Sequence, residues 1–383
     1  MAMDLRGKEL PKGITQRKDG RYFAQITRCG NRYVVYDRNL KDIKKKFADL
    51  SYELDHGLYA KEENISFSSW FDIWLVVYKS AHVKRGTICL YRDIYNRYLK
   101  DILGSRKLKD IRVDHIQKIY NDLHSAEYSG NTIELVSTVL NGMYKQAMKN
   151  KIVRENPVAS ATLPKKKRPE KVRAMTVEEQ DIFVRFSKES NLHDLFRTAL
   201  YTGLRSGELR GLEWKNIDFE NKVIRVRKTL LFINHDYILD DPKTESSKRD
   251  IPMVESLCLI LKQHKIYQNK QRLMMGDKWR PKNGLEDLVF TTETGYPINR
   301  DMLKVEVNRI VAKINDAGIK YQHITPHYWR HTFSVRCLES GMGYKTLQTI
   351  LGHSKLSMTM DLYAHVMPNT KAAEMDKIDG MVG

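Results

Sequence analysis

The hydrophobic pattern of the first sixty residues changes from strand-like to helical. Residues 20–27 and 31–37 are short runs rich in aromatic and β-branched side chains, and the turn at Cys29-Gly30 joins them. Over residues 39–57 apolar side chains recur at helical spacing, and Gly57 stops the pattern: Leu40, Ile43, Phe47, Leu50 and Leu54. This pattern predicts that residues 1–62 form a small α+β domain, a three-stranded sheet with one helix.

Residues 63–163 carry a helical pattern throughout. In the first segment, bulky side chains stand at helical spacing: Trp70, Trp74, Leu75 and Tyr78. Three more amphipathic segments follow before the sequence RENP at 154–157. An aromatic stripe at this spacing is typical of a helical core, so we expect an all-α domain of four helices.

A strongly basic segment separates this region from the rest of the chain. The sequence LPKKKRPEKVR, at 163–173, holds six Lys or Arg and two prolines, which predicts an extended linker over residues 164–174. Thr176 and Glu179 then form a capping-box signature, which opens a last domain over residues 175–383. We expect this domain to be mainly α, with a small β-sheet or hairpin.

The composition adds a large positive charge to this picture. The 383 residues include 66 Lys and Arg against 47 Asp and Glu, a formal net charge of +19. Nucleic acid is the usual partner for such an excess, although an anionic membrane would also attract it. We find no apolar run near membrane-spanning length, no signal segment and no lipidation motif. The four cysteines form no CxxC pair, which argues against disulfides and a zinc module and predicts a cytoplasmic protein.

Basic residues of the first two domains and the linker are candidates for DNA contacts. A three-stranded sheet with basic residues along it could lie in a DNA groove, and a basic linker could follow a duplex. The alternative is a charged face that only contacts solvent. The candidates are Arg17, Lys18, Arg21, Arg28, Arg32, Lys84, Arg85, Lys165, Lys166, Lys167 and Arg168.

Two stretches of the last domain place basic residues in unusual contexts. In TGLRSGEL, flanking glycines predict that Arg205 lies between two helices and is buried. A buried Arg needs an anionic partner, and either Glu208 or a phosphate would serve. In ILDDPKTESSKRDIPM, Pro242 and a polar run predict a hairpin turn with Lys243 at its tip.

A third stretch, ITPHYWRHTF, combines a helix start with imidazole and guanidinium groups. Thr325 suits the N-cap and Pro326 the first helical position. His327 and Arg330 are three residues apart and so project from one face of the helix. An exposed helix start without a function is the alternative.

The fourth stretch is ILGHSKLSMTMDLYAHV. Gly352 is expected to end one helix, and His353 stands where the next begins. Tyr363 follows ten residues later. Because the chain has 20 tyrosines, this residue gains meaning only from the other three stretches.

Together these residues suit phosphoryl transfer on DNA. Two guanidiniums can hold the non-bridging oxygens of a phosphodiester and neutralise charge in the transition state. A tyrosine phenol attacks once a base accepts its proton, and histidine can do so near neutral pH. A lysine on a loop can protonate the departing 5′-oxygen. We see no carboxylate cluster for Mg²⁺ and no GxxxxGK[ST] loop, so we expect neither a metal ion nor another cofactor.

The motifs TGLRSGEL, PHYWRHTF and LGHSKLSMTMDLYAH, in this order and with PKT…S.R between the first two, closely resemble the boxes of tyrosine recombinases, the phage lambda-type integrases. The N-terminus resembles the arm-binding domain of integrases from conjugative transposons and temperate phages of Gram-positive bacteria. The resemblance implies an arm-type DNA-binding domain, a helical core-binding domain and a catalytic domain with a C-terminal tail. It further implies a site-specific recombinase that integrates and excises a mobile element.

The resemblance also assigns roles to residues. Arg205 and Arg330 would clamp the scissile phosphate, with His327 beside them as general acid/base. Lys243 would protonate the leaving 5′-hydroxyl, and Tyr363 would attack to give a 3′-phosphotyrosine.

Further residues receive supporting roles. His353 would hydrogen-bond the phosphate, and Glu208 would support the site. Lys248 competes with Lys243 for the role of the acid, because both lie on the predicted hairpin. We interpret His331 and His365 as structural residues.

The resemblance implies partners as well. A phosphotyrosine retains the phosphodiester energy, so that rejoining needs no cofactor. A homotetramer would exchange strands between two duplexes, at core and arm attachment sites, through a Holliday junction. An excisionase and a host DNA-bending protein are possible accessory factors. The apolar stripe of the tail at 369–381 would dock on a neighbouring protomer or pack on its own domain.

Three alternatives compete with this interpretation. A type IB topoisomerase-like enzyme would cleave and religate without partner exchange, but an arm-binding domain would be superfluous there. A DNA-binding regulator would be expected to lack at least one active residue, and none is missing. A peripheral membrane protein would account for the charge but not for the motifs.

Overall fold

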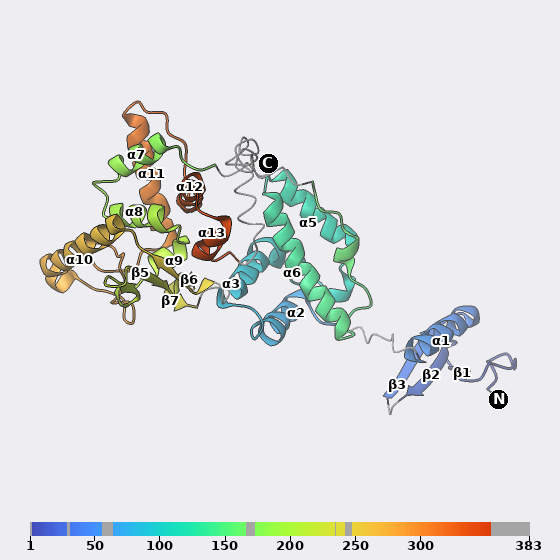
Figure 1. The fold of residues 1–383 in the computed structure, drawn as a ribbon. Helices are drawn as coiled ribbons and strands as arrows, with labels where there is room; N and C mark the ends of the chain where they lie inside the picture. The colour runs from blue at the N-terminus through green and yellow to red at the C-terminus, as the bar shows by residue number, and fades with distance from the viewer. Residues whose placement is uncertain are drawn as a thin grey trace, which may run out of the picture. The chain divides into compact units, whose positions relative to one another are not determined.

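The computed structural model describes most of the chain, and its helices and strands are shown in Figure 1. The described ranges are 2–28, 31–55, 64–165, 173–233, 235–241 and 247–353. The chain divides into two compact units, Met1–Arg168 and Pro169–Gly383, and this division falls inside the basic segment 164–174. Within the described ranges, no helix is both long and apolar enough to cross a membrane.

The N-terminal region is a small sheet covered by one helix, as predicted. Its elements are β1 (Ile14–Gln16), β2 (Tyr22–Arg28), β3 (Asn31–Asp37) and α1 (Leu40–Asp55). The strands are antiparallel in the order β1-β2-β3, and α1 contacts β2 and β3. Ile14 pairs with Ala24 across the sheet, and both are buried with Ile43 of α1. The expected helix stop, Gly57, lies outside the described residues.

Residues 64–165 form four helices around an apolar core, which confirms the prediction. The elements are α2 (Phe67–Ile73) with η1 (Trp74–Lys79), α3 (Arg85–Ile94) with η2 (Tyr95–Leu99) and α4 (Lys100–Leu103), η3 (Leu108–Asp110), α5 (Val113–Ser125), α6 (Gly130–Lys149) and η4 (Pro157–Ser160). Trp70, Trp74 and Leu75 are buried, as the aromatic stripe predicts. Phe71 stacks on Tyr95 with ring centroids 3.9 Å apart.

The second unit is mainly helical. Its helices are α7 (Val177–Phe186), α8 (His193–Thr202), α9 (Ser206–Arg210), η5 (Trp214–Asn216), α10 (Glu255–Met275), η7 (Gly276–Lys278), α11 (Arg300–Asp316), α12 (Pro326–Glu339) and α13 (Tyr344–Leu351). The predicted capping box opens α7, where Thr176 and Glu179 satisfy each other's backbone N–H groups. α12 packs on α8, and the buried Trp329 contacts the rings of Phe183 and Phe196.

Two small antiparallel sheets lie in the same unit, beside α9 in Figure 1. They are β4-β5-β8 and β6-β7, formed by β4 (Ile217–Asp218), β5 (Val223–Val226), β6 (Thr229–Ile233), β7 (Asp236–Asp240) and β8 (Arg249–Pro252). The predicted hairpin around Pro242 is wrong, because β7 pairs with β6 whereas β8 pairs with β5. The reason is burial, since Ile251 of β8 pairs with the buried Ile224 of β5. The segment that carries Lys243 therefore connects two sheets.

Candidate active site

The turn after α8 anchors the site. Gly203 caps this helix with φ of 59°, a left-handed conformation that favours glycine. A Cβ at Gly203 would lie 2.4 Å from Cδ1 of Phe333, so even alanine would push against α12. The Gly203 carbonyl accepts a hydrogen bond of 2.7 Å from Nη1 of Arg330. The end of α8 thus holds a guanidinium of α12.

Arg205 and Glu208 form the first ion pair of the site. Arg205 immediately precedes α9, and its backbone N–H donates to Oε2 of Glu208 at 3.0 Å, while Nη1 donates to Oε1 at 2.8 Å. Glu208 is therefore the carboxylate partner that the sequence offered. The expected burial of Arg205 is wrong, because its side chain is 35% exposed while that of Glu208 is 3% exposed. Arg205 stands at the start of a short helix, where protein covers only part of its guanidinium.

Arg330 is buried deep in the site. It is 7% exposed, and besides Gly203 it donates from Nη2 to the carbonyl of Leu351 at 2.7 Å. Burial, followed by the positive charge of Arg205, lowers the pKa of Arg330 to about 9. The guanidiniums of Arg205 and Arg330 therefore repel each other within the site. A bound anion would remove this repulsion.

His327 lies one turn before Arg330, in the first turn of α12 behind Pro326. Thr325 occupies the N-cap position as predicted, but its side chain makes no capping hydrogen bond. Partial burial, and then the charges of Arg330 and Arg300, lower the pKa of His327 below its usual value. The imidazole is therefore neutral at pH 7 and has a lone pair that can accept a proton.

His353 follows the C-cap of α13, where Gly352 has φ of 64°, as the sequence predicted for a helix end. Burial and the charges of Arg330 and Arg205 lower the pKa of His353 to about 4. At pH 7 this ring is neutral and can donate one hydrogen bond. His331 is also kept neutral, because burial and then His327 lower its pKa.

Arg249 is the Arg of the PKT…S.R pattern, and sequence reasoning assigned it no role in the site. Its side chain is 4% exposed, and it donates from Nη2 and Nη1 to the two carboxylate oxygens of Glu208 at 2.9 and 3.2 Å. Burial alone would raise the pKa of Glu208, but these hydrogen bonds and the charges of Arg249 and Arg205 hold it below its usual value. The alternation along β8 contained the signal, since Arg249 shares the buried face with Ile251.

A polar cavity of about 820 Å³ opens beside His353. Its lining includes Lys248, Arg227 and Lys345, together with the backbone turn at Gly352. The cavity places further positive charge near the guanidiniums of Arg205 and Arg330. Lys248, the alternative acid, therefore lies near the site.

Several predicted residues lie outside the described part of the chain, and the structure does not place them. They are Lys243, Tyr363, His365, Lys166, Lys167, Arg168, the tail 369–381 and the side chain of Arg28.

The remaining DNA-contact candidates are on the surface. The guanidinium of Arg17 lies 5.3 Å from the ring centre of Phe23 and 5.1 Å from that of Tyr36. Arg32 lies 5.9 Å from the ring centre of Phe23, and Arg21 forms an exposed ion pair with Asp19. The others, equally exposed, are Lys18, Lys84, Arg85 and Lys165.

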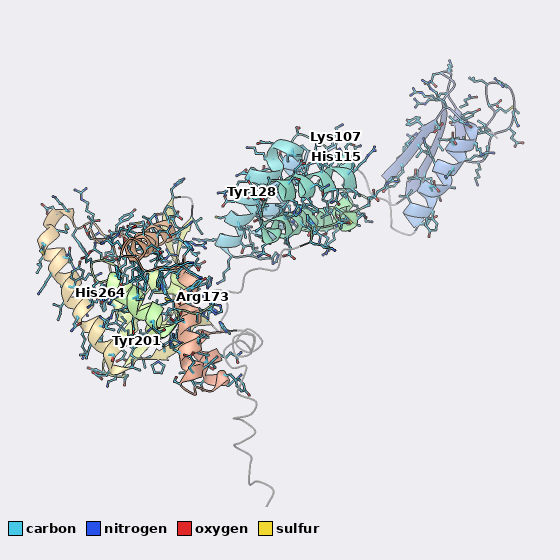
Figure 2. All side chains as sticks on the ribbon, turned by 90° about the horizontal axis from the view of Figure 1, so that it is seen from above. Lys107, His115, Tyr128, Arg173, Tyr201 and His264 are labelled. Atoms are coloured by element: carbon cyan, nitrogen blue, oxygen red, sulfur yellow. The ribbon has the colours of Figure 1, made fainter. Side chains whose placement is uncertain are left out.

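Away from this cluster, the burial of His264 has a structural explanation. His264 of α10, labelled in Figure 2, has Nδ1 3.1 Å from Oδ2 of Asp194 in α8 and Nε2 2.9 Å from the carbonyl of Val289. These contacts join α10 to its neighbours. Among the described residues, no three His, Cys, Asp or Glu side chains form a group suited to a metal ion.

Comparison with known proteins agrees with the geometry. Residues 168–370 match the phage integrase family, and residues 66–124 match the SAM-like N-terminal domain of phage integrases. A tyrosine recombinase XerC-like protein of Caldanaerobacter subterraneus subsp. tengcongensis is 29% identical over 90% of this chain and 91% of its own length. The transposase from transposon Tn916 of Enterococcus faecalis is 28% identical over 98% of this chain and 96% of its own length.

Solved structures share the fold. The Tn1549 transposon integrase in complex with transposon right end DNA has a TM-score of 0.68 and 26% identity, covering 82% of this chain and all of that chain. A lambda integrase tetramer bound to a Holliday junction has a TM-score of 0.53 over 93% of this chain and 95% of that chain. At 16% identity, the second similarity concerns the fold alone.

Proposed function

The chain belongs to the phage integrase family, and from this membership and the geometry of the site we propose that it is a site-specific tyrosine recombinase that cuts and rejoins DNA. One observation carries the proposal. Arg205 and Arg330 converge on the end of α13, next to two histidines that are neutral at pH 7. Such a site is built for an anion that gains charge during reaction.

Cleavage proceeds by attack of a phenol on a phosphodiester. The oxygen of Tyr363 forms a bond to phosphorus and its proton passes to His327. The bond from phosphorus to the 5′-oxygen breaks, and Lys243 gives that oxygen a proton. Arg205 and Arg330 neutralise the non-bridging oxygens in the transition state.

Two groups assist this step. His353 donates a hydrogen bond to the phosphate from its neutral ring, and Glu208 holds Arg205 in place. The product is a 3′-phosphotyrosine and a free 5′-hydroxyl. Attack by a 5′-hydroxyl from another strand reverses the step and joins new partners, so that strand exchange needs no ATP or metal ion.

The remaining parts of the chain would select and assemble the DNA. We assign residues 1–62 to arm sites, residues 63–163 and the linker 164–174 to the core site, and residues 175–383 to catalysis. The charge of +19 supports this assignment. The Tn1549 integrase in complex with transposon right end DNA supports DNA as the partner, and we extend to this chain a homotetramer on two duplexes. The protein would act in the cytoplasm and would integrate and excise a mobile element, with an excisionase and a DNA-bending protein as accessory factors.

Covalent trapping tests the proposal. The protein is mixed with nicked duplexes carrying the DNA that flanks its gene, in EDTA without ATP, and compared with Tyr363→Phe on denaturing gels. We expect a protein–DNA adduct with the wild type only. Binding by both proteins without any adduct would instead support a non-catalytic regulator. An adduct without transfer to a second duplex would support a topoisomerase-like enzyme.

A further inference from the structure

Three arginines bind three consecutive carbonyls at the end of α13. Arg249 donates from Nε to Ile350, Arg330 from Nη2 to Leu351, and Arg205 from Nη2 to Gly352. The last carbonyls of a helix have no partners within it and carry partial negative charge. Here each carbonyl accepts a hydrogen bond from a guanidinium. The next residue after these carbonyls is His353.

The three arginines differ in how many donors they have left. Arg249 uses four N–H groups on protein acceptors, because Nη1 also donates to the carbonyl of Ser247 at 3.1 Å. Within the described residues, Arg205 and Arg330 each use two side-chain N–H groups. Since a guanidinium has five N–H groups, these two retain donors for a phosphate. Arg249, in contrast, uses four of its five N–H groups for hydrogen bonds within the protein.

Glu208 transmits the position of Arg249 to Arg205. Both oxygens of this buried carboxylate accept from Arg249, and both also accept from Arg205, one from its side chain and one from its backbone. Arg205 is the more exposed of the two arginines, so a fixed carboxylate limits its motion. The same arginine that fixes Glu208 also holds the Ile350 carbonyl, three residues before His353.

We propose that Arg249 is a positioning residue for DNA cleavage, which sets Arg205 through Glu208 and sets His353 through the end of α13. The proposal rests on the recombinase function given above. Arg249 does not touch the phosphate. It is the first residue of β8.

The test measures cleavage of a nicked core site in a single turnover at saturating DNA, with binding measured separately. Arg249→Met should slow cleavage about 10²-fold while the dissociation constant for DNA changes less than about threefold. Arg249→Lys should be intermediate, because an ammonium cannot reproduce the planar fork that spans Glu208 and Ile350. Arg225→Met is the control for loss of an arginine from the same sheet, since Arg225 forms a more exposed ion pair with Asp218 outside the site. It should cleave like the wild type.

A substrate with a methylphosphonate at the scissile position separates positioning from general damage. This group has one fewer negatively charged oxygen, so it depends less on the clamping guanidiniums. The defect of Arg249→Met should shrink at least tenfold on this substrate, as should that of Arg205→Ala. The proposal would be overturned if Arg249→Met lost the same factor in cleavage rate on both substrates. It would also be overturned if Arg249→Met cleaved as fast as Arg225→Met.

A double variant covers the case in which Arg249→Met does not fold. Replacing both partners of a buried ion pair removes the unpaired charge that destabilises single variants, so Glu208→Leu/Arg249→Met should fold. It should show the same slow cleavage and the same relief by methylphosphonate. If the wild type itself forms no adduct, the recombinase function is wrong. If the wild type forms the adduct and the Arg249 variants cleave DNA at the same rate, only the positioning role is wrong.

Discussion

The helical region 64–165 and the second unit bury their residues in different ways. Among the described residues, every buried polar or charged side chain lies between Ser187 and Ser334, and none lies in the helical region. There, buried polar tips are limited to aromatic side chains such as Trp70, whose Nε1 donates to the carbonyl of Met143 at 3.1 Å. Burying charge is costly unless it is paired. The second unit buries charged side chains such as Arg330 and Glu208, which fixes the guanidiniums of the site. The helical region buries no charged side chain among its described residues.

The largest expected effect comes from the most buried clamp residue. Arg330→Lys loses the fork that joins Gly203 and Leu351, and an ammonium cannot hold two phosphate oxygens in its place. We expect single-turnover cleavage to fall by at least about 10²–10³-fold, with DNA binding largely kept. Retention of more than a tenth of the cleavage rate would contradict the role of Arg330.

Glu208→Gln tests whether the buried charge is paired as described. The change leaves Arg249 buried without a countercharge, so we expect the free energy of unfolding to fall by about 3–5 kcal/mol. Denaturant unfolding of the full chain measures this loss. A stability equal to the wild type would mean that Glu208 does not balance Arg249.

Leu140→Ala is the matching change in the helical core. Leu140 is fully buried in α6, so its truncation should lower the free energy of unfolding by about 2–5 kcal/mol. Cleavage at saturating DNA, measured well below the melting temperature, should stay within about twofold of the wild type. A large loss of cleavage with intact folding would break the contrast between the two regions.

The pH dependence of cleavage should report His327. Its pKa lies below 6.5, so the ring stays neutral as the pH falls through 6.5 and cleavage at subsaturating DNA stays constant there. Only below its lowered pKa does protonation remove the base and slow the reaction. In His327→Gln the fall of the cleavage rate at low pH should disappear. The pH-independent cleavage rate of this variant should be lower than that of the wild type. A midpoint above 6.5 would show that the ring is not in the described environment.

The smallest effect is expected on the N-terminal sheet. Arg17→Ala should weaken binding of arm-site DNA and lower the slope of log K against log salt by about one. Cleavage of an isolated core site should not change. An unchanged salt dependence would place the arm contact elsewhere on the domain.

The sequence predicts the helical region better than the site. Apolar periodicity and aromatic stripes place Trp70 and Trp74 correctly, because burial of apolar groups follows local spacing. The contact of Arg249 with Glu208 joins residues 41 positions apart, and no local pattern reveals a pairing of that kind. Similarly, the polar run before β8 indicates a turn, but it does not show which strand β8 pairs with. β8 pairs with β5 and not with β7, because strand pairing depends on which buried faces meet. The carbonyl acceptors at the end of α13 carry no signal in residue type at all.

Mapping the residue that carries the DNA tests the central claim most directly. The adduct trapped in EDTA is digested with protease and nuclease, and mass spectrometry locates the remaining nucleotide. We predict a 3′-nucleotide on Tyr363, formed without metal ion, and its loss in Arg330→Lys. A nucleotide on another residue, or a 5′-linkage, would contradict the account of this site.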